Sequence, residues 1–161
     1  MLKEKILQNL NAALKEKKGL ETSVLRMLLA AILNKEKEKR YRIFKETSNL
    51  PFAAARLTDE EIIEVISAEA KKRRESIEGF QKGNRQELAD KEKKELEMLE
   101  KYLPEQLSQE ELKKLVQEAI AKVGAKEMRD MGKIMQELMS KIKGKADGSS
   151  VSKTVKELLG Q

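Results

Sequence analysis

The sequence contains neither cysteine nor histidine. Without cysteine the chain has no disulfide bond and no thiol nucleophile, and without both residues it lacks the usual ligands of zinc. Histidine is also the one side chain that ordinarily titrates near neutral pH, and it is the commonest general acid or base. These absences exclude many kinds of catalysis, and we expect no bound metal and no cofactor.

Aromatic residues make up only 3% of the chain, and its two prolines are Pro51 and Pro104. The scarcity of aromatics disfavours β-sheet, whereas the abundant Leu, Lys, Glu, Ala and Met are good helix formers. An all-α fold is therefore expected, with both prolines between helices.

Long hydrophobic runs are absent as well. Runs such as Met27 to Leu33 are far shorter than the roughly 20 residues that span a membrane, and the N-terminus lacks the apolar region of a signal peptide. We therefore expect a cytoplasmic protein without a membrane partner.

Charge of both signs is abundant, since 34 basic and 28 acidic residues give a net charge of +6. A basic balance favours nucleic acid or another polyanion as the partner. Because the acids and bases are interspersed, a solvated helical surface accounts for most of these charges.

The N-terminal part of the chain, residues 1–103, predicts a helical domain of its own. Its clearest helix start is the capping box that Thr58 forms with Glu61. Weaker signals predict that Thr22 caps one helix and that Asn84 starts another.

The C-terminal part, residues 104–161, predicts a compact bundle of three short helices. A second capping box, Ser108 with Glu111, starts its first helix, and Gly124 is a natural left-handed cap for the end of that helix. Four methionines recur at helical spacing and are expected mainly in the core: Met128, Met131, Met135 and Met139.

Serines near Lys153 are the nearest approach to a nucleophile with an activating base. We interpret Ser149 or Ser150 as a helix cap instead, because the pair follows Asp147-Gly148 and precedes an apolar stripe. No catalytic residue is therefore assigned.

Two carboxylates, Glu92 and Glu95, interrupt the apolar stripe of a predicted helix. Carboxylates at this spacing can hold a cation, but a solvated or salt-bridged face is the interpretation we favour. Nor does the segment Gly144 to Gly148 have the spacing of a phosphate-binding loop, so ATP binding has no support.

The most suggestive charge pattern lies between Lys141 and Lys156, where five lysines accompany one acid, Asp147, and give the segment a net charge of +4. Lysines beside a helix N-terminus can hold RNA phosphates through ammonium groups and backbone N–H donors, without reading sequence. A solvated loop is the alternative interpretation. The candidate RNA-binding residues are Lys133, Lys141, Lys143, Lys145, Lys153 and Lys156. A secondary basic patch consists of Lys71, Lys72, Arg73 and Arg74, which cannot all face one partner.

Motifs that resemble those of one family occur at Leu25–Leu28, Lys71–Ser76, Glu95–Leu112, Asp130–Met135 and Lys141–Gly148. The chain is identified by them as a member of the YqeY family, and the resemblance covers nearly its whole length. It departs from about Tyr41 to Arg56, where the link between two helices is longer than usual. We interpret that stretch as an irregular connector packed on the surface.

The resemblance implies a place near tRNA-dependent amide chemistry. The family's C-terminal bundle, of the GatB/YqeY-like type, is similar to the tail domain of the B subunit of glutamine-dependent aspartyl/glutamyl-tRNA amidotransferase, which contributes to tRNA binding. The leading hypothesis is a non-catalytic protein that binds tRNA or associates with a tRNA synthetase or amidotransferase. One alternative is the carbon–nitrogen ligase activity, with glutamine as amido donor, that such proteins are often assigned. Another is a protein-interaction adaptor without RNA binding.

Overall fold

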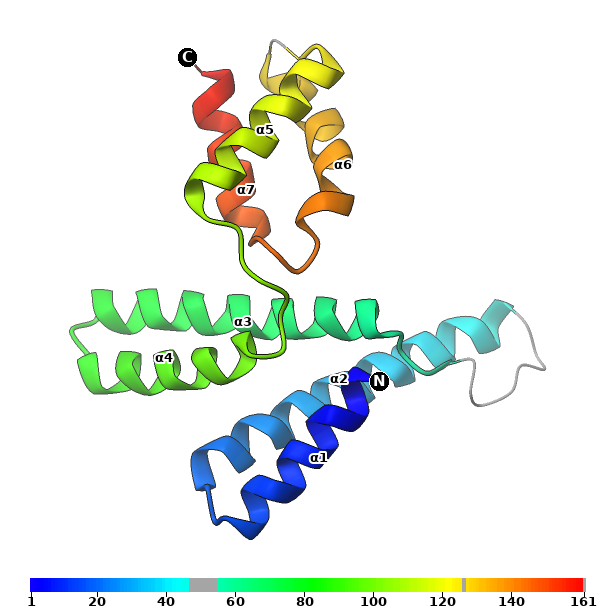
Figure 1. Cartoon of the computed structure of the whole chain (residues 1–161), viewed down its shortest axis with the longest axis vertical. Helices are drawn as coiled ribbons and strands as arrows, with labels where there is room; N and C mark the ends of the chain where they lie inside the picture. Colours follow the sequence, from blue (N-terminus) through cyan, green and yellow to red (C-terminus); the bar gives the residue numbers. More distant parts are fainter. Residues whose placement is uncertain (47–54, 126, 161) are drawn as a thin grey trace. The chain divides into compact units, whose positions relative to one another are not determined.

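The computed structural model describes residues 1–46, 55–125 and 127–160, and every regular element within these ranges is a helix (Figure 1). The prediction of an all-α fold is confirmed for this part of the chain. No helix in it combines the length and the hydropathy that a membrane span requires. The helices in chain order are α1 (Leu2–Lys15), α2 (Gly19–Glu46), α3 (Asp59–Lys82), α4 (Gln86–Glu100), α5 (Gln109–Val123), the short 3-10 helix η2 (Met128–Asp130), α6 (Met131–Ile142) and α7 (Gly148–Leu159).

The chain divides into two compact units, Met1–Tyr102 and Leu103–Gln161. The first contains α1 to α4, and the second contains α5 to α7. Independent folding of each unit, as domains 1–103 and 104–161, stays a prediction.

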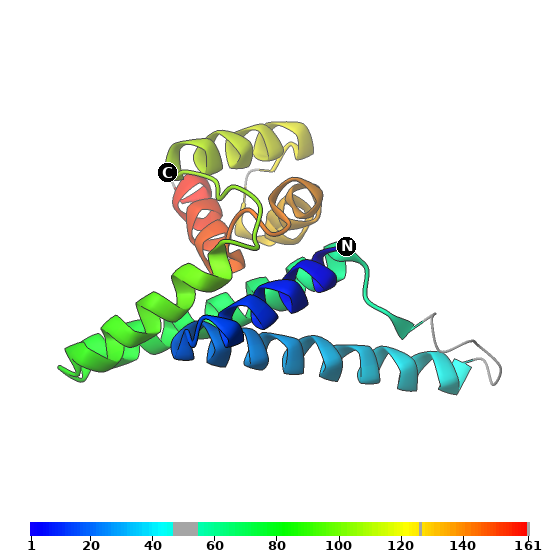
Figure 2. The same ribbon diagram turned by 60° about the horizontal axis from the view of Figure 1, so that its bottom comes forward.

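The first unit is built from two helical hairpins. Figures 1 and 2 show α1 beside the first half of α2 and α4 beside α3, and α2 also contacts both α3 and α4. Amphipathic helices pack in this way because each has one apolar stripe to bury. The large buried side chains of this unit are Ile6, Val24, Leu25, Leu28, Ile32, Ile62, Ile66 and Leu99.

Both predicted capping boxes are present. The Thr58 hydroxyl accepts a hydrogen bond from the Glu61 N–H, and the Glu61 carboxylate accepts one from the Thr58 N–H at 2.7 Å. Ser108 and Glu111 repeat this pattern at the start of α5. Gly124 ends α5 with a φ of +66°, in the left-handed region that glycine adopts without strain.

Two of the weaker helix-start predictions are wrong. Helix α2 already begins at Gly19, so Thr22 lies in its first turn and is buried rather than capping it. Helix α4 begins after Arg85 without a side-chain cap. Asn84 instead takes a φ of +53°, which lets the chain turn between α3 and α4, and asparagine is one of the few non-glycine residues that tolerate this conformation.

Helix α2 continues to Glu46, which corrects the interpretation of an irregular connector from about Tyr41. The apolar stripe fades beyond Ile32, but the following lysines, glutamates and arginines are good helix formers and carry the helix on. The ion pair between Lys35 and Glu38, one turn apart, also supports it. The remainder of that predicted connector, residues 47–54, lies outside the described residues.

The second unit packs α5, α6 and α7 around one shared core. Val116, Ile134 and Leu138 lie at its centre and are completely buried. Met131 and Met135 pack against this core as predicted, but Met128 and Met139 are 48% and 57% exposed. The remaining fully buried or nearly buried members of the core are Leu112, Ala119, Ala125, Ile142, Val151 and Val155.

Candidate nucleic-acid interface

The loop between α6 and α7 carries Lys143 and Lys145, and its backbone is held by the segment that leads into α5. The Gln106 side-chain amide donates to the Gly144 carbonyl at 2.7 Å, and the Leu107 N–H donates to the Lys145 carbonyl at 2.8 Å. Gly144 takes a φ of +74°, which only glycine adopts easily. Two hydrogen bonds therefore fix the backbone from which the Lys145 side chain extends.

Helix α7 is capped by Asp147, not by Ser149 or Ser150. The Asp147 carboxylate accepts hydrogen bonds from the Ser149 and Ser150 N–H groups at 3.2 and 3.4 Å, and the Ser149 hydroxyl also donates to it. Aspartate is a strong helix cap, and its charge favours the positive end of the helix dipole. Because this carboxylate accepts from those N–H donors, they are not available to a phosphate. Of the two kinds of donor predicted to hold RNA phosphates, only the lysine ammonium groups remain.

The six candidate lysines are not gathered at one place. Lys133 lies near the start of α6, eight residues or about 12 Å along the helix from Lys141. Its ammonium group lies 3.3 Å from Asp130, and that of Lys141 lies 3.8 Å from Glu118 of α5. Lys143 is exposed and also interacts within the chain.

The other three candidates are exposed, and they extend from the loop before α7 to the last turn of that helix. Lys145 lies in the loop, and Lys153 and Lys156 share the face of α7 opposite the buried Val151 and Val155. Within the described ranges none of these three lysines forms an ion pair. They are therefore available to contact an external anion, as are Lys113 and Lys114 of α5, which are also exposed and form no ion pair among the described residues.

The secondary basic patch on α3 is already engaged. Lys71 and Lys72 pair with glutamates of their own helix, Glu75 and Glu69, and the Arg74 guanidinium lies 2.8 Å from Glu100 of α4. Arg73 also points to α4. The prediction that the four cations cannot face one partner agrees with these directions, and RNA binding by the patch stays a prediction.

Arg73 joins the two carboxylates that interrupt the apolar stripe of α4. Its Nη1 lies 2.8 Å from a Glu92 oxygen, and its Nη2 lies 2.9 Å from a Glu95 oxygen. The three side chains are only 17%, 16% and 8% exposed, respectively. The favoured interpretation of a salt-bridged face is confirmed, and a positive side chain occupies the place that a cation would take.

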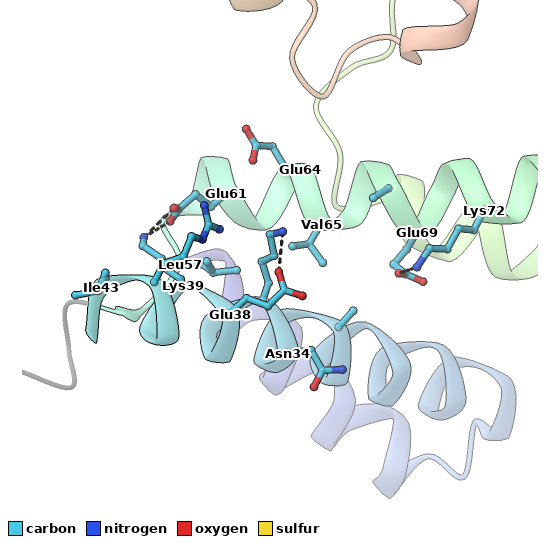
Figure 3. A pocket seen from close by; sticks show the side chains of 14 residues that line it. Asn34, Glu38, Lys39, Ile43, Leu57, Glu61, Glu64, Val65, Glu69 and Lys72 are labelled. Atoms are coloured by element: carbon cyan, nitrogen blue, oxygen red, sulfur yellow. Dashed lines mark hydrogen bonds and ion pairs between the residues drawn. The ribbon is translucent and has the colours of Figure 1, made fainter. Parts of the chain in front are cut away.

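An open groove of about 730 Å³ lies between α2 and α3 (Figure 3). Lys39 bridges its end, donating to both Glu61 oxygens at 2.8 and 2.7 Å and to the Arg56 carbonyl at 3.1 Å. The Lys39 hydrogen bond, with help from the Thr58 N–H, holds the pKa of Glu61 below its ordinary value. The described lining residues carry as many acids as bases, so the groove has no net charge to attract a polyanion.

Two features of these surfaces were missed at the sequence level. Gln106 and Leu107 contact the loop between α6 and α7, which lies 38 residues further along the chain. No periodic pattern in the sequence predicts a contact of this kind. Tyr41 and Phe44 are 66% and 69% exposed on a regular helix, although we expected them in an irregular connector. Their spacing of three residues, which places both on one helix face, was the available signal.

The helices of the described ranges define an all-α protein. The model of the family described as Yqey-like protein matches residues 3–159, so the chain belongs to the YqeY family.

Two relatives are similar over part of the chain. A protein of Pyrenophora tritici-repentis named "Altered inheritance of mitochondria protein 41, mitochondrial" is 35% identical over 107 residues, which cover 64% of this chain and 58% of the relative. An uncharacterized protein of Schizosaccharomyces pombe is 39% identical over 51 residues, which cover 32% of this chain and 42% of the relative. The matches thus span about half the length of these relatives.

Proposed function

We propose that this protein binds tRNA without catalysing a reaction of its own, and that the C-terminal unit contacts the RNA backbone through Lys145, Lys153 and Lys156. The proposal places the protein near tRNA-dependent amidation, where a tRNA synthetase or an amidotransferase is the expected protein partner. The family resemblance supports that setting, because the amidotransferase tail domain to which the bundle is similar contributes to tRNA binding.

One observation carries the proposal. Three lysines lie in the loop before α7 and on its outer face, exposed and without an ion pair among the described residues, while most other cations around them are paired. The Leu107 N–H holds the Lys145 carbonyl, so the backbone from which this side chain extends is fixed. Exposed, unpaired lysines give affinity for phosphates that does not depend on base sequence.

The carbon–nitrogen ligase alternative receives no support from the geometry. The Ser149 hydroxyl, the nearest candidate nucleophile, donates to the Asp147 carboxylate that caps α7. A serine in that position completes a helix cap, and its proton is directed to the capping aspartate rather than to Lys153. The adaptor alternative, in which the protein binds a partner but no RNA, is an outcome of the experiment below.

The experiment measures tRNA affinity as a function of salt concentration for the whole protein and for the triple variant Lys145→Ala, Lys153→Ala, Lys156→Ala. Each phosphate contact contributes about 0.7 to 0.9 to the slope of log affinity against log salt, so three lost contacts reduce the slope by roughly 2 to 3. The variant should keep its melting temperature, because exposed lysines contribute little to stability.

The matched control removes the same charge from the other unit, with Lys91→Ala, Lys93→Ala and Lys94→Ala on the exposed face of α4. We expect this control to keep the slope of the unchanged protein. Equal slopes for all three proteins would refute the assignment of the three lysines, and the absence of any tRNA binding would favour the adaptor.

The location of the protein belongs to the same proposal. A cytoplasmic location stays a prediction, and one relative carries the word mitochondrial in its name.

A further inference from the structure

The outer half of α2 extends past the beginning of α1 (Figures 1 and 2). The Lys3 ammonium group at the start of α1 lies 2.6 Å from Glu36 of α2. The turns of α2 after Glu36 therefore extend beyond the first turn of α1. Lys39 contacts Glu61 near the start of α3. Beyond these two ion pairs, one side of the helix faces away from α1 and from the groove with α3, and among the described residues Ala55 and Arg56 lie beside it.

That side combines aromatic and cationic residues, and we call it the α2 outer face. Successive turns bring its members together at intervals of three or four residues. Leu33, Tyr41 and Phe44 are 48%, 66% and 69% exposed, although large apolar side chains are usually buried. The α2 outer face consists of Leu33, Lys37, Arg40, Tyr41 and Phe44.

The α2 outer face contains no carboxylate. The two neighbouring acids, Glu36 and Glu38, lie outside it and are bound by Lys3 and Lys35. Lys37, at the centre of the face, forms no ion pair within the described part of the chain. The face therefore complements an anionic partner that also offers flat apolar surfaces.

A small hollow adjoins the α2 outer face. It has a volume of about 150 Å³, and its described lining residues include Leu33 and Ala55, with Lys37, Arg40 and Arg56 among the others. A cavity of about this volume in another protein accepts one benzene ring. The remaining charged residue of its lining, Glu36, is held by Lys3. The hollow thus offers an apolar wall for one ring beside several cations.

We infer that the α2 outer face binds unpaired nucleotides of single-stranded RNA, with bases stacked on Tyr41 and Phe44 and a phosphate near Lys37. This inference rests on the proposed function and extends it by naming the kind of RNA segment that this unit takes. Aromatic side chains beside cations are the usual means by which proteins hold single strands, because every base has a flat face and every nucleotide a phosphate.

A lipid surface fits the α2 outer face less well. A helix that lies in a membrane interface buries a continuous apolar face and keeps its cations on the opposite side. Here Lys37 lies between Leu33 and Tyr41, one turn from each, in the middle of the apolar residues. In a strand of RNA a phosphate links each nucleoside to the next, so charged and flat apolar groups alternate along it as they do on the α2 outer face.

The test uses the whole protein and a short single-stranded oligouridylate, with an abasic oligonucleotide of the same length and charge as the comparison. The double variant Tyr41→Ala, Phe44→Ala should bind oligouridylate at least about tenfold more weakly, because each stacked base contributes about fivefold to a hundredfold. Its salt slope should not change, since no phosphate contact is lost. Lys37→Ala should instead reduce the slope by about 0.7.

The matched control is the double variant Leu7→Ala, Leu14→Ala, which removes two leucines of α1 that are 42% and 43% exposed. It should bind oligouridylate as the unchanged protein does. Photocrosslinking with 5-bromouridine in the oligonucleotide should modify Tyr41 or Phe44, as mapped by mass spectrometry. Abasic RNA should bind the unchanged protein and the aromatic double variant equally.

The outcomes separate this inference from the proposed function. If tRNA binding depends on Lys145, Lys153 and Lys156 but oligouridylate affinity does not depend on Tyr41 and Phe44, the inference fails and the proposed function stands. If oligouridylate binding requires Tyr41 and Phe44 but tRNA binding does not depend on the three lysines, the inference stands and the assignment of the three lysines fails. A different outcome is that the double variant Tyr41→Ala, Phe44→Ala loses binding to phosphatidylserine vesicles and keeps its binding to RNA. That result would overturn the inference in favour of a membrane surface.

Discussion

At the scale of single residues, the environment of Arg73 decides how its charge is used. Of the four consecutive cations of α3, Lys71 and Lys72 stay exposed, whereas Arg73 is almost enclosed between Glu92 and Glu95. A guanidinium can serve two carboxylates at once because its N–H donors are held in a planar fork. Arg73 therefore stabilises the packing of α3 on α4, and its charge is not available to RNA.

We predict that Arg73→Ala lowers the free energy of unfolding of the first unit by about 3 kcal/mol, since it leaves two glutamates buried without their cation. Lys72→Ala, on the same turn but exposed, should change it by less than about 0.5 kcal/mol. Urea denaturation followed by circular dichroism measures both. A loss below about 1 kcal/mol for Arg73→Ala would mean that water compensates the two carboxylates and that the network contributes little.

At the scale of the elements, the two capping boxes predicted helix starts correctly, whereas the weaker signals at Thr22 and Asn84 did not. The capping boxes at Thr58 and Ser108 were found because the box depends on two residues three positions apart in the sequence. The end of α2 was missed because it depends on helix propensity and on ion pairs, without an apolar stripe. Asn84 was misread because the same side chain serves as a cap or as a left-handed turn residue, and only the neighbouring helices select between them.

The candidate site was predictable to a smaller extent than the fold. The imbalance of lysines near α7 is visible in the sequence, but the pairing of Lys133 with Asp130 and of Lys141 with Glu118 depends on how the helices pack. The cap of α7 is Asp147, whose carboxylate accepts from two serine N–H groups, and the sequence alone did not distinguish it from those serines. Some of the candidate lysines form ion pairs and others do not. The periodicity of the sequence does not distinguish the two groups.

The two capping boxes also provide a matched pair of variants. Replacement of Thr58 by Ala should destabilise the first unit by about 1 kcal/mol, and replacement of Ser108 by Ala should destabilise the second by a similar amount, since each removes one N-cap hydrogen bond. If the two units unfold independently, each variant should shift one transition and leave the other in place. Differential scanning calorimetry of the whole protein measures this, and a common shift of a single transition would identify one cooperative domain.

At the scale of the whole molecule, the charges divide into those that hold helices together and those that remain for a partner. Arg73, Arg74 and Lys39 belong to the first group, because each contacts a carboxylate of another helix. Lys145, Lys153 and Lys156 belong to the second group. The second unit carries 11 basic and 9 acidic residues, so its attraction for a polyanion depends on where its unpaired lysines lie and not on its net charge.

Crosslinking in living cells, followed by sequencing of the RNA recovered with the protein, tests the central claim most directly. We predict that tRNA is enriched with the unchanged protein and that the enrichment falls strongly for the Lys145→Ala, Lys153→Ala, Lys156→Ala variant. The Lys91→Ala, Lys93→Ala, Lys94→Ala control should retain it. Recovery of no RNA above background, or of tRNA in equal amounts with all three proteins, would contradict the assignment of RNA binding to the C-terminal unit.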